Sequence, residues 1–194
     1  MLKIDAMGDV CPLPVIKVKK ALKESSEILI RVDNEIATQN LTKMAKQLNL
    51  KAKVEKITEK DYQVFIFSEN KEVDIKKYSP TFLGNKYVVV ISGNTMGAGD
   101  DKLGHALLKG FIYSLTEQEL LPENVIFYNG GATLTSEGSS VLDDLRQLKS
   151  LGVEVLTCGA CLDFFGLKEK LAVGEVTNMY HIVELMSQFH VVKP

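Results

Sequence analysis

The sequence of 194 residues predicts an α/β protein built from two domains. In the first 70 residues, short alternating segments and helical segments follow one another in the order β-α-β-α-β-β. After residue 85, apolar strands alternate regularly with amphipathic helices, which is typical of parallel βαβ units. We therefore expect domains at 1–70 and 85–194, joined at 71–84 by a charged linker that ends in proline and glycine signals.

The elements of the first domain follow from residue spacing. Apolar side chains recur at helical intervals in two segments, and strict apolar–polar alternation marks the half-buried strands. The polar turn TEKD separates the last two strands, so these should form a hairpin. The expected strands are 2–5, 27–33, 51–57 and 62–67, and the expected helices are 13–24 and 37–48.

The second domain opens with an almost wholly apolar strand, which indicates a strand buried on both faces. Its second helix has Ser139 or Ser140 as the expected cap and Gly152 at its end. The expected strands are 86–92, 124–130, 153–158 and 190–193, and the expected helices are 102–117, 139–152, 163–171 and 180–189.

Composition and charge exclude several functional classes. Hydrophobic residues make up 45% of the chain and charged residues 25%, which is typical of a globular protein. The net charge of −2 favours neither nucleic acid nor a membrane surface as a partner. No apolar run approaches the ~20 residues of a membrane helix. Because the sequence opens without the apolar core of a signal peptide, we expect a cytoplasmic protein with reduced thiols.

Cys11 is the first of three cysteines, in the stretch DVCPLPVIKVKKAL. Pro12 and Pro14 suit the entry and first turn of a helix, where a backbone N–H has no helical partner. A thiol at a helix N-terminus is stabilised as a thiolate, so its pKa should fall from ~8.5 toward neutral. The residues alone leave a second interpretation open, in which Cys11 is a small buried hydrophobe.

Cys158 and Cys161 form a C-x-x-C at the end of the third strand of the second domain. The carboxyl ends of strands in an open parallel sheet border the working crevice. We expect Cys161 near the N-terminus of the next helix, with Asp163 as its cap. Three interpretations remain open: half of a zinc site, a thioredoxin-like dithiol, or a persulfide acceptor whose second thiol resolves it.

Glycine-rich loops follow the first two strands of this domain. Such a loop can shape the crevice beside Cys158, or offer backbone N–H groups to an anionic ligand. The segment NGGATLTSEG at 129–138 is expected to form a second wall. The residues expected to line the crevice or bind a ligand there are Gly93, Asn94, Gly97, Gly99 and Asn178.

The segments IDAMGDVCPLPVIKVKKAL and VDNEIATQNLTKMAKQLN make residues 1–70 resemble the TusA/SirA-like family. The resemblance implies a two-layer α/β sandwich whose Cys-Pro-x-Pro cysteine, here Cys11, accepts sulfane sulfur as a persulfide. The implied donor is a cysteine desulfurase or another persulfide carrier. The chain departs from the family at Leu13 and at Asp9, whose charge should raise the pKa of a neighbouring thiol.

Residues 85–194 resemble the DsrE/DsrF-like family in the initial buried strand, in SGNTMGAGDDKLG and in the cysteine at a strand end. This implies a parallel-sheet, three-layer α/β/α domain, with Cys158 as the sulfur-carrying cysteine; Cys161 has no counterpart in the simplest members. The fusion of the two domains is similar to the YedF-like proteins of sulfur and selenium metabolism.

Together these observations predict a persulfide or perselenide carrier in which sulfur moves from Cys11 to a second thiol site at Cys158 and Cys161. We expect no cofactor and no metal, a downstream sulfur or selenium acceptor protein as partner, and a homo-oligomer formed through the second domain. Two alternatives remain: a non-enzymatic adaptor for sulfur or selenium enzymes, and a dithiol oxidoreductase that uses the C-x-x-C.

Overall fold

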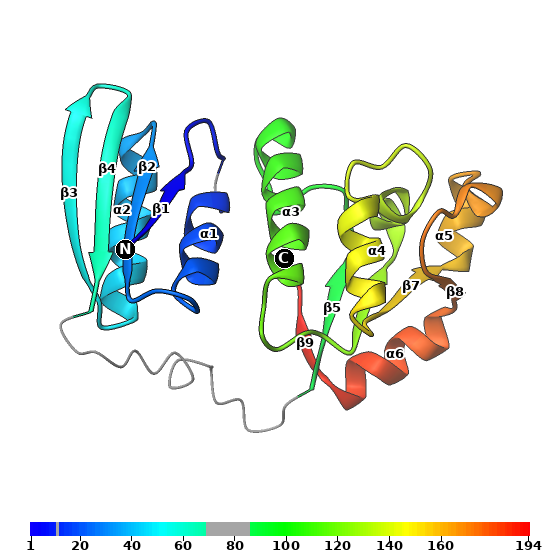
Figure 1. The fold of residues 1–194 in the computed structure, drawn as a ribbon. Coiled ribbons are helices and arrows are strands. Elements are labelled where there is room, and N and C mark those ends of the chain that lie inside the picture. The colour runs from blue at the N-terminus through cyan, green and yellow to red at the C-terminus, as the bar shows by residue number, and fades with distance from the viewer. Residues whose placement is uncertain (11, 69–85) are drawn as a thin grey trace. The chain divides into compact units, whose positions relative to one another are not determined.

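The computed structural model describes residues 1–10, 12–68 and 86–194. Cys11 and the predicted linker at 71–84 therefore lie outside the described residues. Contacts between Cα atoms divide the chain into two compact units, Met1–Thr81 (unit 1) and Phe82–Pro194 (unit 2). Both units combine sheets with helices, so the expected α/β class is confirmed (Figure 1). In the part of the chain that is described, no helix is both long and apolar enough to cross a membrane.

Unit 1 contains a four-stranded sheet and two helices in the predicted order. The sheet order is β1-β2-β4-β3, with β1 and β2 parallel and the other neighbours antiparallel. The antiparallel pairing of β3 with β4 confirms the predicted hairpin. The elements are β1 (Leu2–Asp5), α1 (Leu13–Ala21), β2 (Glu27–Val32), α2 (Glu35–Gln47), β3 (Lys51–Thr58) and β4 (Asp61–Phe67).

The core of unit 1 lies between the helices and one face of the sheet. Burial alternates along β2 and β4, so every second side chain points into the core. Val18 of α1 and Leu41 of α2 are fully buried against Ile30 and Val64 of the strands. Burying such a side chain contributes about 1.5–3 kcal/mol each. The packing holds the first turn of α1 at a set place beside α2.

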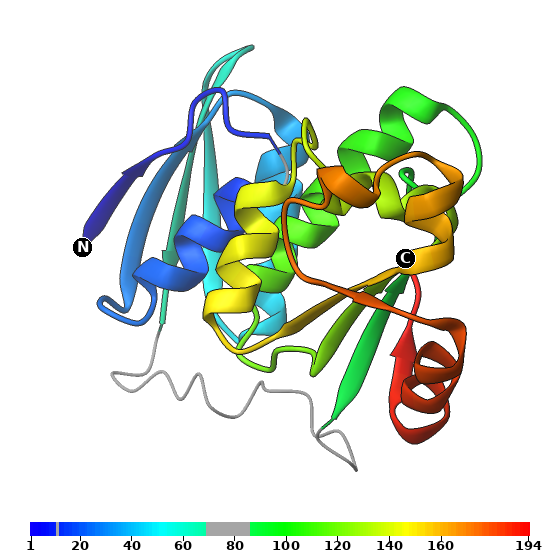
Figure 2. The same cartoon turned by 90° about the vertical axis from the view of Figure 1, so that its right-hand side faces the viewer.

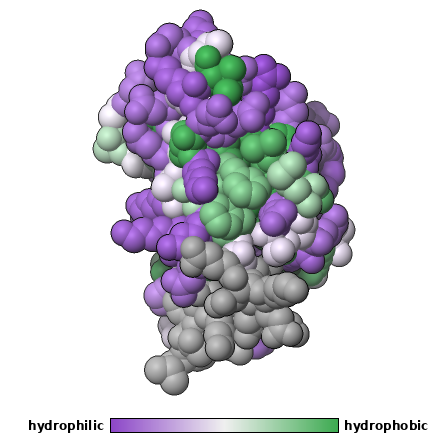
Figure 3. Space-filling view, turned by 60° about the vertical axis from the view of Figure 1, so that its left-hand side comes forward, coloured by the Kyte–Doolittle hydropathy of each residue, from purple (hydrophilic) through white to green (hydrophobic). Residues whose placement is uncertain are grey.

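The other face of this sheet is partly exposed. Figure 3 shows apolar side chains gathered among hydrophilic ones on the side where β3 and β4 lie in Figure 1. The rings of Phe65 and Phe67 stack there with centroids 4.9 Å apart. The Lys53 ammonium lies 5.7 Å from the Phe67 centroid, within the range of a cation–π contact.

Unit 2 contains a five-stranded, wholly parallel sheet in the order β8-β7-β6-β5-β9. The parallel βαβ arrangement expected from the sequence is confirmed. The elements are β5 (Tyr87–Ile91), α3 (Asp101–Thr116), β6 (Asn124–Phe127), the 3-10 helix η2 (Asn129–Thr135), α4 (Leu142–Ser150), β7 (Glu154–Cys158), α5 (Gly159–Phe164), the 3-10 helix η3 (Lys168–Lys170), β8 (Glu175–Thr177), α6 (Met179–Gln188) and β9 (His190–Val192).

Both faces of the unit 2 sheet are covered. Val89 and Ile91 of β5 pack with residues of α3 and α4, whereas Val88 and Val90 pack with residues of α6. Figure 2 shows these helices on opposite sides of the strands. Burial on both faces explains why β5 reads as a continuous apolar run.

Two expectations for unit 2 are wrong in detail, and one strand was not expected. The expected strand at 124–130 ends at Phe127, because Asn129 adopts a φ of 51° and starts η2. The strand β8, only three residues long, was not predicted. The expected helix at 163–171 is replaced by α5 and η3, because Gly166 with a φ of 64° interrupts the helical path.

Two expected caps are also wrong. Cys158 occupies the N-cap position of α5, and Asp163 lies inside that helix, where it pairs with Lys168 at 3.4 Å. The helix predicted at 139–152 begins at Leu142 without a side-chain cap. The Ser139 hydroxyl instead accepts a hydrogen bond from the Val141 N–H at 3.4 Å, in the turn before the helix.

Candidate functional site

The start of α1 forms the first part of the candidate site. Pro12 occupies the N-cap position, Pro14 lies in the first turn, and no side chain caps this end of the helix. Pro12 and Pro14 have no N–H, the Leu13 N–H donates to the Val10 carbonyl oxygen at 2.9 Å, and the Val15 N–H donates to the Pro12 carbonyl oxygen at 3.1 Å. Positive charge at this end of the helix therefore comes from the helix dipole. Cys11 directly precedes Pro12 but lies outside the described residues, so the structure describes the flanks of this thiol.

Asp9, two residues before Cys11, is paired with a lysine of α1. The Lys17 Nζ lies 2.5 Å from Asp9 Oδ2 and also donates to the Asp5 carbonyl oxygen at 3.3 Å. Asp9 Oδ2 is buried and accepts no hydrogen bond of regular geometry among the described residues, so the contact is an ion pair rather than an aligned hydrogen bond. The ammonium offsets the carboxylate charge that the sequence places beside the thiol.

The loop before Cys11 is also tied to the start of α2. The Gly8 N–H donates to Asp33 Oδ2 at 3.0 Å, and Gly8 has a φ of 77° that favours glycine. The Asn34 side chain donates to Asp33 Oδ1 at 2.7 Å and accepts from the Ala37 N–H at 2.9 Å, which caps α2. The Asn34 hydrogen bond is the main reason that the pKa of Asp33 is lowered. The Gly8–Asp33 hydrogen bond therefore holds the loop before Cys11 against the segment that begins α2.

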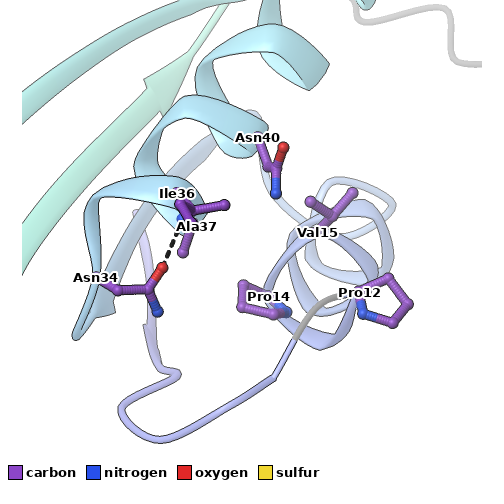
Figure 4. A pocket seen from close by; sticks show the side chains of 7 residues that line it. All are labelled: Pro12, Pro14, Val15, Asn34, Ile36, Ala37 and Asn40. Atoms are coloured by element: carbon purple, nitrogen blue, oxygen red, sulfur yellow. Dashed lines mark hydrogen bonds between the residues drawn. The ribbon is translucent and has the colours of Figure 1, made fainter. Parts of the chain in front are cut away.

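A small cavity lies between the start of α1 and the start of α2 (Figure 4). Its volume of about 30 Å³ has room for only a few atoms, so it is a shallow hollow rather than a substrate chamber. Ile36 on its rim is 67% exposed, and Val10 is 71% exposed. The lining residues are Pro12, Pro14, Val15, Asn34, Ile36, Ala37 and Asn40.

In unit 2, the strand ends meet at one edge of the sheet. The register pairs Ile91 with Phe127, Phe127 with Thr157, and Cys158 with Thr177. Because all these strands are parallel, the segments that follow them lie along the same edge. The structure therefore places the C-x-x-C and both glycine-rich loops at the carboxyl end of the sheet.

The two cysteines of unit 2 are free thiols with different surroundings. Cys158, the last residue of β7, is only 2% exposed, whereas Cys161 on α5 is partly exposed. The backbone N–H of Asn129 donates to Cys161 Sγ at 3.0 Å. Burial raises the pKa of Cys161, the Asn129 N–H opposes that rise, and the neighbouring Cys158 adds to it.

The turn that brings Asn129 to Cys161 depends on Gly131, which packs against the end of β5. A Cβ on Gly131 would lie 2.2 Å from the Ile91 carbonyl oxygen, so only glycine fits against the end of β5. A Cβ on Gly130 would lie 3.6 Å from the Gly93 Cα, which is an ordinary contact. The sequence predicts this segment as a crevice wall but does not predict the Asn129–Cys161 contact. An asparagine two residues after the end of β6 is the available signal, because asparagine tolerates a positive φ.

The other predicted crevice residues divide into two groups. Gly93 and Asn94 lie against Gly130, within the strand-end cluster. Gly97 and Gly99 have φ angles of 75° and 149°, and a Cβ on either would meet nothing within 4 Å.

Asn178 has a structural task at the start of α6. Its side chain accepts from the His181 N–H at 3.1 Å and caps the helix. Nδ1 of the same histidine lies 3.1 Å from Thr177 Oγ1.

Within the described residues, no group of three or more His, Cys, Asp or Glu side chains could hold a metal ion.

Comparison with known proteins gives a family match for the first part of the chain. The family profile described as Sulfurtransferase TusA matches residues 2–67. A Methanocaldococcus jannaschii protein described as a candidate sulfur carrier, MJ0990, is 33% identical over 69 residues, which cover 34% of this chain and 92% of that protein.

Solved structures also resemble parts of the chain. A SirA-like protein from Desulfitobacterium hafniense is 38% identical, with a TM-score of 0.34, over 36% of this chain and 100% of that one. A protein of unknown function from Methanobacterium thermoautotrophicum is 22% identical, with a TM-score of 0.45, over 56% of this chain and 98% of that one.

Proposed function

The chain belongs to the TusA family through residues 2–67, and from this premise we propose that it carries sulfane sulfur as a persulfide on Cys11. The main support for this proposal is that the family match spans the whole sheet of unit 1 and contains Cys-Pro-x-Pro at the start of α1. The helix start and the paired Asp9 support a thiolate at this position.

The proposed transfer is a thiol–persulfide exchange. The Cys11 thiolate attacks the terminal sulfur of a donor persulfide, R–S–SH; a new S–S bond forms, the donor S–S bond breaks, and the donor leaves as the thiolate R–S⁻. The products are Cys11–S–SH and the reduced donor, so atoms and charge balance without a further oxidant. The proposed donor is a cysteine desulfurase, and the acceptor is a downstream sulfur or selenium protein.

We also propose that unit 2 holds a second thiol site, formed by Cys158 and Cys161, in a DsrE-like three-layer α/β/α domain. The free thiols at the carboxyl edge of a parallel sheet support this role, as does the N–H aimed at Cys161. On this view, residues 1–70 and 85–194 are separate domains of a YedF-like cytoplasmic relay, unit 1 is a two-layer sandwich, and copies associate through unit 2. Selenium would follow the same exchange chemistry as a perselenide.

The test is sulfur loading of the full chain. The protein is incubated with a cysteine desulfurase and cysteine, and the peptides are mapped by mass spectrometry. We expect one added sulfur atom on the Cys11 peptide, and its loss in Cys11→Ser. A wild-type chain that gains no sulfur on Cys11 would contradict the carrier function.

A dithiol oxidoreductase is the second candidate, because Cys158 and Cys161 are both free thiols and lie three residues apart at the N-terminal end of α5. This activity would not depend on Cys11. Reduction of a disulfide substrate at the wild-type rate by Cys11→Ser, together with no sulfur loading, would favour it.

A further inference from the structure

We infer that Cys161 is the thiol of unit 2 that receives sulfane sulfur from outside, and that Cys158 is the resolving thiol behind it. This assignment rests on the proposed second thiol site. It reverses the roles implied by the family resemblance of unit 2, in which the cysteine at the strand end carries the sulfur. Access, the hydrogen-bond donor at Cys161 and the chemistry of release each support it.

The two sulfurs of unit 2 differ in how accessible they are to an incoming persulfide. Cys158 is 2% exposed and belongs to a hydrophobic cluster that includes Ile182 and Leu185 of α6. An incoming persulfide must place its terminal sulfur in contact with the attacking sulfur. Contact with Cys158 would first require local opening of α5 or α6, whereas Cys161 already has exposed surface.

The donor at Cys161 supports the same assignment. The Asn129 N–H, 3.0 Å from Cys161 Sγ, can stabilise negative charge on that sulfur when it becomes a thiolate. Asn129 holds its N–H there in a left-handed conformation, with a φ of 51°, which is uncommon for a residue other than glycine.

The reactivity of Cys161 suits a receiving thiol that holds its cargo. Burial raises the pKa of Cys161, so the thiolate is a minor form at neutral pH. The small thiolate fraction slows attack by Cys161 overall, but a thiolate of high pKa is a poor leaving group. Sulfur received by Cys161 therefore stays until a second thiol removes it.

Cys158 is placed to perform that removal. It precedes Cys161 by three residues and is the N-cap residue of α5, the helix that contains Cys161. The Cys158 sulfur attacks Cys161 Sγ, the Sγ–S bond of the persulfide breaks, and the terminal sulfur leaves as HS⁻. The products are the Cys158–Cys161 disulfide and sulfide: the sulfane sulfur is reduced by two electrons, and the two thiols are oxidised by two.

The test uses the full chain with Cys11→Ser, so that only unit 2 can take up sulfur, and glutathione persulfide as the donor. Added sulfur is mapped on alkylated peptides, and released sulfide is measured. In Cys158→Ser we expect a stable persulfide on Cys161 and little sulfide. In Cys161→Ser we expect sulfur uptake to fall at least about tenfold, because Cys158 reacts only after local opening. Wild-type uptake on Cys158 in Cys161→Ser, or no uptake in Cys158→Ser, would overturn the assignment.

A second measurement avoids any doubt about the folding of the variants. The native wild-type chain is treated briefly with iodoacetamide under reducing conditions. We expect Cys161 to be alkylated at least about tenfold faster than Cys158, and faster alkylation of Cys158 would contradict the inference. Parallel loading from a desulfurase separates the two proposals: if Cys161 takes up sulfur from glutathione persulfide but Cys11 remains unloaded, the carrier function of unit 1 fails and the assignment in unit 2 stands.

Discussion

At the residue scale, the environment of the first thiol depends on how Asp9 is compensated. A carboxylate two residues from a sulfur that reacts as an anion should disfavour the reaction. The Lys17 ammonium 2.5 Å from Asp9 Oδ2 offsets this charge, and the Asp9 side chain is only 19% exposed, so water screens the pair incompletely. Lys17, six residues after the cysteine, thus offsets the negative charge of Asp9, two residues before it.

Replacing Lys17 should therefore slow the reaction of Cys11. In Lys17→Gln the Asp9 carboxylate is left without its cation, and we expect alkylation of Cys11 at neutral pH to slow about threefold to tenfold, equivalent to up to one pH unit in thiolate formation. The measurement is the iodoacetamide rate at Cys11 across a pH series. The matched control is the double variant Asp9→Asn with Lys17→Gln, which should recover the rate. Equal rates in Lys17→Gln and the wild type would show that the pair does not affect the thiol.

Cys161 should react with an alkaline pH profile. Its pKa is raised mainly by burial, so the thiol form persists above the pH at which an exposed cysteine ionises. The alkylation rate should rise with pH and reach half its maximum on the alkaline side of the value for the unfolded chain. Cys158 also raises the pKa of Cys161, so Cys158→Ser should shift the midpoint toward lower pH. A wild-type midpoint below that of the unfolded chain would contradict this account.

At the element scale, the NGG turn connects the strand framework with the thiol. Gly131 packs directly on the end of β5, and the turn then presents the Asn129 N–H to a sulfur 32 residues away in sequence. The position of one hydrogen-bond donor thus depends on close approach between two backbone segments.

Gly131→Ala should damage both stability and the thiol environment. The added Cβ would lie 2.2 Å from the Ile91 carbonyl oxygen, so the turn must shift. We expect the free energy of unfolding of unit 2 to fall by about 1–3 kcal/mol, which is typical of overpacking, and the alkylation rate of Cys161 to change as its N–H donor moves. Urea unfolding and alkylation kinetics measure the two effects.

Gly130→Ala is the control, because its Cβ would make only an ordinary contact 3.6 Å from the Gly93 Cα. Its stability should stay within about 0.5 kcal/mol of the wild type. If the two variants behave alike, close packing of Gly131 does not position the turn.

The sequence predicts which loops meet at the carboxyl edge of the unit 2 sheet, but not the individual contacts that they make there. Parallel βαβ units require the loops after successive strands to meet, so the neighbourhood of Gly93, the NGG segment and Cys158 follows from the order of elements alone. The Asn129–Cys161 contact does not, because it joins residues whose separation follows no helical or strand period. Strand β8 escaped prediction because three residues cannot establish an alternation.

At the scale of the whole molecule, each unit has its own core. The buried cluster of unit 1 draws on residues between Ala6 and Ile66, and the two clusters of unit 2 draw on residues between Val88 and Leu185. The two sheets also differ in pairing: two of the three strand pairings in the sheet of unit 1 are antiparallel, whereas every strand pairing in the sheet of unit 2 is parallel. The linker predicted at 71–84 lies outside the described residues.

Separate cores predict that residues 1–68 fold and load sulfur by themselves. The fragment keeps all four strands, both helices and the Asp9–Lys17 pair, so its stability should be that of a small single-core domain, about 3–5 kcal/mol. We expect a cooperative urea transition, and loading of Cys11 by a desulfurase at the rate of the full chain. The same fragment with Cys11→Ser is the control for sulfur bound elsewhere. A folded fragment that loads much more slowly than the full chain would mean that residues after 68 help the donor to dock, because the thiol and its compensated carboxylate are the same in both proteins.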